Sequence, residues 1–281
     1  MGRVTLSACR RRLYSKRMVE RGPESTMCSR KELAMLPHVV RLLPLVAAAF
    51  APLAVEASSP GETRNILVYG DSITWGWVPT APIVPTVRHA EEDRWPTIAG
   101  SALGAGYNVI TEGLSGRTTN VEDPTAPGLM NGADYLDAAL MSHEPIDLVV
   151  IMLGTNDTKT YLDRSPLEIG LGMGELVNLA QEGSGLGWYA YDRPQVLLIS
   201  PPPLGDAIDP AAAEDFRGSD EKITALPDIY ARIAEAAGAH FFDAASVVEK
   251  DEVGTDGIHL LVQGNRDLGE AVAAEIREIL E

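Results

Sequence analysis

The sequence predicts an α/β protein, a three-layer α/β/α sandwich built on a five-stranded parallel sheet. From residue 64 onward, five short apolar runs alternate with longer stretches in which apolar residues recur at helical spacing. The runs are apolar almost without interruption, as is typical of strands that helices cover on both faces. Five strand–helix units in succession favour a parallel sheet, because each helix carries the chain back across the sheet before the next strand begins.

The predicted strands combine β-branched, leucine and aromatic residues. In chain order they are Asn65–Tyr69, Tyr107–Thr111, Ile146–Leu153, Gln195–Ser200 and Ala239–Phe242. One predicted helix follows each strand, at Trp95–Leu103, Ala133–Met141, Pro166–Gln181, Asp220–Ala237 and Val262–Leu280. In the last helix, Leu268, Val272 and Ile276 recur every fourth residue, which gives it one apolar face to pack on the sheet. Four irregular segments are long: Val78–Asp93, Thr119–Gly132, Gly183–Arg193 and Pro201–Gly218. Loops of this length are usually functional or form an interface.

The charge of the chain changes sign near residue 60. Residues 1–60 hold ten basic and four acidic side chains, whereas residues 61–281 hold 13 basic and 36 acidic ones. The acidic part, 221 residues long, can bury one good core, so we interpret it as a single domain. A surface this acidic repels phosphate backbones, and we therefore expect no nucleic-acid partner.

The N-terminal part is interpreted as a targeting segment. Leu42–Val55 is an uncharged apolar run of 14 residues, shorter than the roughly 20 residues that a membrane-spanning helix needs. Basic residues precede this run and small residues follow it, a pattern typical of a signal peptide. We expect residues 35–60 to be a signal peptide or apolar leader, and residues 1–34 to be a basic extension that is disordered or absent from the mature protein. The protein is then secreted or periplasmic, or cytoplasmic if the leader is not a functional signal, with no stable membrane span in either case.

Neither a metal site nor a cofactor is expected. The only two cysteines, Cys9 and Cys28, precede the acidic domain, which therefore has no disulfide and no thiolate ligand. No pair of histidines has the spacing of metal ligands. The glycines of Gly70–Gly76 do not match phosphate-binding patterns, so a nucleotide-binding module is the weaker alternative.

Polar motifs follow the predicted strands at the edge of the sheet where α/β proteins bind ligands. The motifs after the first three strands are Gly70–Ser72, Gly113–Arg117 and Gly154–Asp157, and a fourth, Asp256–His259, precedes the last helix. Because the carboxyl ends of parallel strands meet at one edge of a sheet, we expect these motifs to lie close together.

Ser72, Asp256 and His259 have the chemistry of an activated serine. A serine hydroxyl becomes a nucleophile when an imidazole accepts its proton and a carboxylate orients that imidazole. Asp256 and His259 are three residues apart, so one turn lets the carboxylate meet one ring nitrogen while the other faces Ser72. Taken singly, the motifs have plainer explanations: Ser72 caps a helix, Asn156 caps a helix or bonds a loop, and Asp71 is a structural turn residue.

The motifs, in this order, resemble those of the SGNH hydrolases, the GDSL-type esterase superfamily. They are similar in particular to the mycobacterial arylesterase/acyltransferase group, which is known for acyl transfer in water and for perhydrolysis. The similar segments are Gly70–Val78, Glu112–Asn120, Ile151–Lys159, Ser200–Leu204, Asp256–His259 and Asn265–Gly269. The resemblance covers roughly residues 64–281, and it departs from the group at Gly116, where alanine is usual, and along Val78–Asp93.

The resemblance implies a flavodoxin-like SGNH hydrolase domain over residues 61–281 and gives each motif a role. Ser72 is implied as the nucleophile, His259 as the base and Asp256 as its partner. The backbone N–H groups of Ser72 and Gly116, with the side chain of Asn156, are implied as the oxyanion hole. Around them we expect an acyl pocket that includes Trp77, Leu114, Thr155 and Ile258, although packing in the core is an equal alternative for the tryptophan.

The activity that the resemblance implies is that of a serine esterase and acyltransferase. Its substrates are small-molecule esters, short-chain (acetyl-like) or aryl, and the acyl group passes from an acyl-enzyme to water, an alcohol or hydrogen peroxide. The alternatives are a carbohydrate O-acetyl esterase, a lysophospholipase-type hydrolase, and a non-catalytic module that binds acyl or glycan ligands. The resembling enzymes are oligomers whose neighbouring subunits narrow the entrance, so we expect a homo-oligomer. Thr119–Gly132 and Gly183–Arg193, with Trp188 and Tyr189, are candidates to narrow the entrance here, and ordinary loop packing is the alternative for the two aromatic residues.

Overall fold

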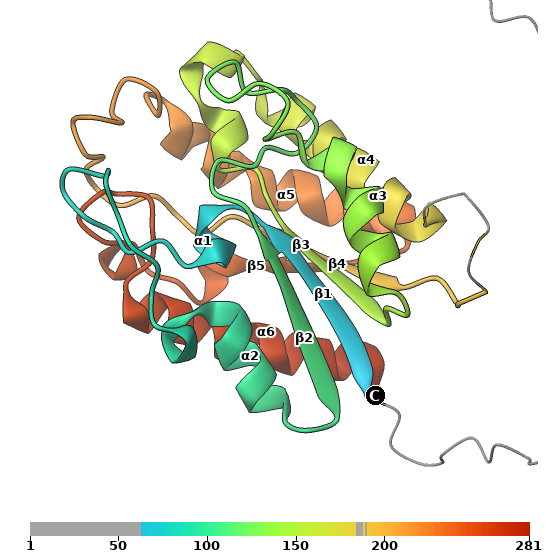
Figure 1. The fold of residues 1–281 in the computed structure, drawn as a ribbon. Helices are drawn as coiled ribbons and strands as arrows, with labels where there is room; N and C mark the ends of the chain where they lie inside the picture. The colour runs from blue at the N-terminus through green and yellow to red at the C-terminus, as the bar shows by residue number, and fades with distance from the viewer. Residues whose placement is uncertain (1–62, 184–187, 189) are drawn as a thin grey trace, which may run out of the picture. The chain divides into compact units, whose positions relative to one another are not determined.

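The computed structural model describes residues 63–183, 188 and 190–281. These residues form a parallel sheet of five strands with helices on both faces (Figure 1). This arrangement confirms the predicted three-layer α/β/α sandwich. The basic extension and the signal peptide expected at residues 1–34 and 35–60 lie outside the described residues. In the part of the chain that the structure describes, no helix is long and apolar enough to cross a membrane.

The predicted strands and helices are all present, and each end lies within two residues of its predicted position. The strands are β1 (Arg64–Gly70), β2 (Tyr107–Gly113), β3 (Leu148–Met152), β4 (Gln195–Ser200) and β5 (His240–Asp243). In the sheet they lie in the order β2-β1-β3-β4-β5. The α-helices are α1 (Ser72–Trp75), α2 (Trp95–Leu103), α3 (Gly132–His143), α4 (Pro166–Glu182), α5 (Ser219–Ala237) and α6 (Val262–Leu280). Only α1, a single turn, has no counterpart among the predicted helices.

The sheet has an apolar layer on each face. Helices α2 and α6 cover one face, and α3, α4 and α5 cover the other (Figure 1). Along β1, Ile66 and Val68 pack with residues of α2 and α6, whereas Leu67 and Tyr69 pack with residues of α3, α4 and α5. None of these four residues is more than 1% exposed, which explains why the strand is apolar at consecutive positions.

The two outermost strands differ from the prediction that all five strands are buried on both faces. Strands β2 and β5 are the edges of the sheet, and every residue of each is at least partly exposed. The prediction is wrong for these two strands because an edge strand has a neighbouring strand on one side only, and the helices do not close over its open side.

Three adjacent strands end at one level, and this positions the loops that follow them. Gly70, the last residue of β1, pairs with Gly113 of β2 and with Met152 of β3. Gly113 allows the first turn after β1 to lie against β2, because a Cβ at this position would be 2.5 Å from the backbone nitrogen of Trp75. The loops after β1, β2 and β3 therefore start side by side at the carboxyl edge of the sheet.

Candidate active site

Ser72 begins the single-turn helix α1 directly after β1. Asp71 caps this turn, since its Oδ1 accepts a hydrogen bond of 3.0 Å from the backbone N–H of Ile73. Gly76 ends the turn with a φ of 93°, a left-handed conformation that glycine adopts at low cost. The turn holds Ser72 at the edge of the sheet with 7% of its surface exposed, and Asp71 has the structural turn role predicted for it.

The turn that precedes α6 brings Asp256 and His259 to Ser72. Asp256 Oδ1 accepts hydrogen bonds from the backbone N–H groups of Ile258 and His259, each 2.9 Å long. Asp256 Oδ2 lies 2.8 Å from His259 Nδ1, and His259 Nε2 lies 2.8 Å from Ser72 Oγ. With its proton on Nδ1, the imidazole donates to Asp256 and accepts from the Ser72 hydroxyl. The structure thus places in contact three residues that the sequence singled out.

Burial and pairing set the charge states of Asp256 and His259. Burial lowers the pKa of His259 below its usual range, and the hydrogen bond and charge of Asp256 offset only part of this effect. Burial also acts to raise the pKa of Asp256, but the hydrogen bonds and charge of His259 outweigh it, so this pKa lies below its usual value. Near neutral pH the pair is therefore a carboxylate beside a neutral imidazole, whose Nε2 accepts a proton.

Asn156 and Gly116 come from neighbouring loops and line the same cavity as Ser72. Asn156 begins a 3-10 turn after β3 and is 6% exposed. Its Nδ2 donates to Asp71 Oδ2 at 3.3 Å and to the carbonyl of Arg117 at 3.2 Å. Gly116 turns the loop after β2 with a φ of 90°, in the region that favours glycine. The three groups implied as the oxyanion hole therefore surround one cavity.

Two further carboxylates, Asp71 and Asp157, are buried next to these loops. Burial, with a smaller contribution from the charge of Asp157, raises the pKa of Asp71 to about 7. Burial also raises the pKa of Asp157, against the hydrogen bond of Thr119 and the charge of Arg164. Over residues 63–183, 188 and 190–281, no group of three or more His, Cys, Asp or Glu side chains is placed to hold a metal ion.

A cavity of about 250 Å³ opens beside Ser72 and His259. Its walls are formed by Ser72, Trp77, Ile83, Val84, Ser115, Gly116, Asn156, Lys159, Phe216, Ile258 and His259. The ring of Trp77 stacks on the ring of His259, with centroids 4.8 Å apart and planes inclined by 15°. The cavity is small and largely apolar, and the bonded pair Ser72 and His259 forms part of its wall, which suits a small ligand with a polar group at that pair.

Two of the four residues expected in the acyl pocket line this cavity, and two do not. Trp77 and Ile258 are part of its wall. Leu114 lines a separate cavity with Tyr69, and Thr155 is packed into the turn after β3 with 3% of its surface exposed. Leu114 and Thr155 are not among the lining residues of this cavity, and their expected place in the acyl pocket stays a prediction.

Five residues of the cavity wall are not among the predicted site residues: Ile83, Val84, Phe216, Lys159 and Ser115, the last of which lies within the predicted motif Gly113–Arg117. Three of them come from the long irregular segments Val78–Asp93 and Pro201–Gly218. The length of these segments was the only sign in the sequence that they contribute to a site. The fourth, Lys159, is paired with a buried carboxylate, since its Nζ lies 3.2 Å from Asp123 Oδ2. The cation at the wall is therefore neutralised within the protein.

Most of this domain matches a known protein family. Residues 68–266 match the family described as GDSL-like Lipase/Acylhydrolase, a range that begins in β1 and ends in α6. Comparison with curated proteins finds no match.

Several solved structures are similar to this chain over nearly their whole length. The native M. smegmatis aryl esterase is 47% identical, with a TM-score of 0.75 over 78% of this chain and 100% of that one. Est24, a carbohydrate acetylesterase from Sinorhizobium meliloti, is 43% identical, with a TM-score of 0.75 over 78% of this chain and 100% of its own. A carbohydrate acetylesterase family member from the same species is 37% identical, with a TM-score of 0.71 over 78% and 99% of the two chains. The resemblance predicted from the motifs is confirmed, and this chain belongs to the GDSL-like lipase/acylhydrolase family.

Proposed function

We propose that this protein is a serine esterase that hydrolyses small short-chain and aryl esters through an acyl-enzyme on Ser72. The observation that carries the proposal is the continuous chain of 2.8 Å contacts from Asp256 through His259 to Ser72 Oγ, which ends at a small apolar cavity. Membership of the family supports the same reaction, as do its aryl esterase and carbohydrate acetylesterase structures.

In the acylation step, Ser72 Oγ attacks the carbonyl carbon of the ester while His259 Nε2 takes the hydroxyl proton. Asp256 keeps the other ring proton on Nδ1 and stabilises the imidazolium that forms. As the tetrahedral intermediate collapses, His259 returns the proton to the departing alcohol, and the acyl group remains on Ser72. Water then attacks the acyl carbon while its proton passes to the same nitrogen. As the second tetrahedral intermediate collapses, His259 returns the proton to Ser72 Oγ and the carboxylic acid is released.

The negative charge that develops on the carbonyl oxygen needs donors that are already in place. We assign this role to the backbone N–H groups of Ser72 and Gly116 and to Asn156 Nδ2, which surround the cavity from three loops. The two backbone N–H groups are fixed before the reaction and cost no reorganisation when the charge appears. Asn156 Nδ2 exchanges one of its two long bonds, to Asp71 Oδ2 at 3.3 Å or to the Arg117 carbonyl at 3.2 Å, for a bond to this oxygen. Trp77, stacked on His259, keeps the imidazole in the plane that both proton transfers require.

The pH dependence of the reaction tests the role of His259. We expect kcat/KM for an aryl acetate to rise with pH through one midpoint below the usual histidine pKa and then to level off. The base works only when neutral, and because burial lowers its pKa, protonation removes the base only at more acidic pH. Initial rates, corrected for the reaction without enzyme and for the folded fraction by circular dichroism, give this midpoint. A midpoint above the usual histidine value contradicts the assignment.

Asn156→Ala tests the oxyanion donor. We expect kcat to fall by about 10²–10³-fold, with a much smaller change in KM, because the donor binds the charge that exists only in the transition state. The matched control is Asn131→Ala, since Asn131 caps α3 by accepting from the backbone N–H of Ala133 at 3.1 Å and does not line the cavity. The control should lose helix stability of about 0.5–2 kcal/mol and keep its kcat. If Asn156→Ala unfolds but its folded fraction keeps normal kcat, the residue is structural.

The size of the cavity predicts the length of the preferred acyl group. Across p-nitrophenyl acetate, butyrate and octanoate we expect kcat/KM to fall, by about tenfold or more at octanoate, because extra methylenes overpack a filled site. Phe216→Ala enlarges the cavity and should reduce the difference in kcat/KM between the acetate and the octanoate. The highest rate with octanoate would favour the lysophospholipase-type alternative instead.

Transfer of the acyl group belongs to the same proposal, because hydrolysis and alcoholysis share one acyl-enzyme. The apolar side chains of Trp77, Ile83 and Phe216 at the wall favour an alcohol over water beside the ester carbon. Repeating the ester series with a primary alcohol, and separating acid from new ester by chromatography, measures this partition.

The carbohydrate acetylesterase that is 43% identical supports a second candidate substrate, an acetylated sugar. The test compares the rate of acetate release from an acetylated sugar with the rate from the aryl acetate.

A further inference from the structure

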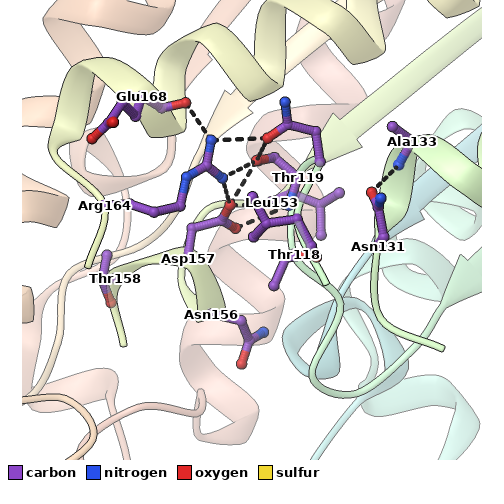
Figure 2. A network of polar contacts seen from close by, with 12 residues as sticks. Thr118, Thr119, Asn131, Ala133, Leu153, Asn156, Asp157, Thr158, Arg164 and Glu168 are labelled. Atoms are coloured by element: carbon purple, nitrogen blue, oxygen red, sulfur yellow. Dashed lines mark hydrogen bonds and ion pairs between the residues drawn. The ribbon is translucent and has the colours of Figure 1, made fainter. Parts of the chain in front are cut away.

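We propose that Arg164 is a positioning residue for this reaction: through the buried carboxylate of Asp157, it fixes the two loops that carry Asn156 and Gly116. The inference rests on the proposed function, since it concerns how the oxyanion donors are held. It is carried by a buried polar network beside those loops, which Figure 2 shows with Arg164 at its centre.

The guanidinium of Arg164 joins residues from three segments of the chain (Figure 2). Its Nη1 forms an ion pair with Asp157 Oδ1 and donates to Thr119 Oγ1 at 2.9 Å. Its Nη2 donates to Asn120 Oδ1 at 2.8 Å and to the carbonyl of Glu168 in the first turn of α4. The side chain of Asp157 has no exposed surface and that of Arg164 is 9% exposed, so water contributes little to this network.

Asp157 links the arginine to both loops. It follows Asn156 directly in the turn after β3, and it also holds the loop after β2. Its carboxylate accepts from the backbone N–H of Thr119 at 3.0 Å and from the Thr119 hydroxyl at 2.6 Å. Thr119 is three residues beyond Gly116. A second bond joins the same two loops, from Asn156 Nδ2 to the carbonyl of Arg117, the residue after Gly116, at 3.2 Å.

Helix α4 packs closely against the residues that Arg164 contacts. A Cβ added at Gly172 would lie 2.3 Å from both Thr119 Oγ1 and Asn120 Oδ1, so the helix backbone lies directly on the network. A buried carboxylate that loses its cation is strongly destabilised or takes up a proton. In either state Asp157 no longer holds both loops as it does beside Arg164.

Neither Arg164 nor Asp157 lines the cavity, so any effect on the reaction passes through the donors that they hold. A planar guanidinium can donate to several acceptors at fixed angles, whereas the ammonium of a lysine is a single point of charge. Arg164→Lys keeps the positive charge beside Asp157 but cannot reproduce the contacts to Thr119, Asn120 and Glu168 together. This variant therefore separates the positioning of the loops from the neutralisation of a buried charge.

The test measures kcat and KM for an aryl acetate in Arg164→Lys, Asn156→Ala and the variant with both substitutions. We expect Arg164→Lys to lower kcat by about 10- to 10²-fold, within the range of a lost oxyanion donor, with KM changed less than about twofold. In the Asn156→Ala background the same substitution should cost less, because one of the two donors through which it acts is gone and only the Gly116 N–H remains to be displaced. The midpoint of the pH profile should stay at the wild-type value, since His259 is untouched.

Arg217→Lys is the matched control, because Arg217 forms an exposed ion pair with Glu214, with side chains 70% and 78% exposed, and should keep wild-type kcat. If Arg164→Lys does not fold, a variant with both Arg164→Gln and Asp157→Asn, which removes both buried charges, replaces it in the comparison with Asn156→Ala. The inference is overturned if either folded variant keeps wild-type kcat, or if its fold-loss in kcat multiplies with the fold-loss of Asn156→Ala. Both results leave the esterase proposal intact. Absence of ester hydrolysis by the wild-type protein overturns the proposed function itself.

Discussion

Ser72→Ala is expected to abolish the hydrolysis of aryl esters, with a loss in kcat of about 10⁶-fold. The substitution removes the oxygen that forms the acyl-enzyme, and no other hydroxyl is bonded to His259 Nε2 in the described part of the chain. The fold should not change, because the cap of α1 is made by the Asp71 carboxylate and the backbone of Ile73. Turnover of p-nitrophenyl acetate, together with the labelling of Ser72 by a fluorophosphonate followed by mass spectrometry, measures the effect.

The control for this prediction is a serine outside the site. Ser142→Ala removes an exposed hydroxyl on α3 that bonds only the carbonyl of Ala138 within the structure described, and it should hydrolyse esters as the wild type does. Full activity in Ser72→Ala, or a fluorophosphonate label on another residue, would end the proposal of a serine esterase at this site.

Asp256→Asn is expected to lower kcat by about 10⁴-fold while leaving the fold intact. The carboxylate Oδ2 holds the proton of His259 on Nδ1, and an amide nitrogen in its place would instead donate to Nδ1. The imidazole then carries its proton on Nε2 and cannot accept the proton of Ser72. The Oδ1 contacts to Ile258 and His259 can persist with an amide oxygen, so the turn should survive.

Asp243→Asn is the comparison for Asp256→Asn. Asp243 ends β5 and accepts from the Ser200 hydroxyl at 2.7 Å and from the backbone N–H of Ala245 at 3.1 Å. Its loss is expected to change stability and not kcat. An Asp256→Asn variant that folds and keeps near wild-type kcat would show that this carboxylate does not set the tautomer of His259.

The sequence was sufficient to predict the elements of the fold, because the signals for them are local. Apolar runs and helical spacing are properties of residues close together in the chain. All ten predicted elements are present, and each end lies within two residues of its predicted position. The turn from Asp256 to His259 is equally local, since three residues separate the side chains that meet. By contrast, the contact of His259 with Ser72 spans 187 residues of sequence, and it was predicted only from strand ends that meet at one edge and from the resemblance.

Tertiary structure alone brought the side chains of the long irregular segments to the cavity. Ile83, Val84 and Phe216 reach it from long irregular segments, and no periodic pattern fixes the direction of a side chain there. Leu114 and Thr155 were expected in the pocket and are not among the residues that line this cavity. Tertiary structure also decided the contacts of Arg164, whose partners Thr119 and Asn120 lie more than forty residues away in sequence. Periodicity and motif chemistry are properties of neighbouring residues, whereas the shape of a pocket and the supports of its donors depend on which distant segments pack together.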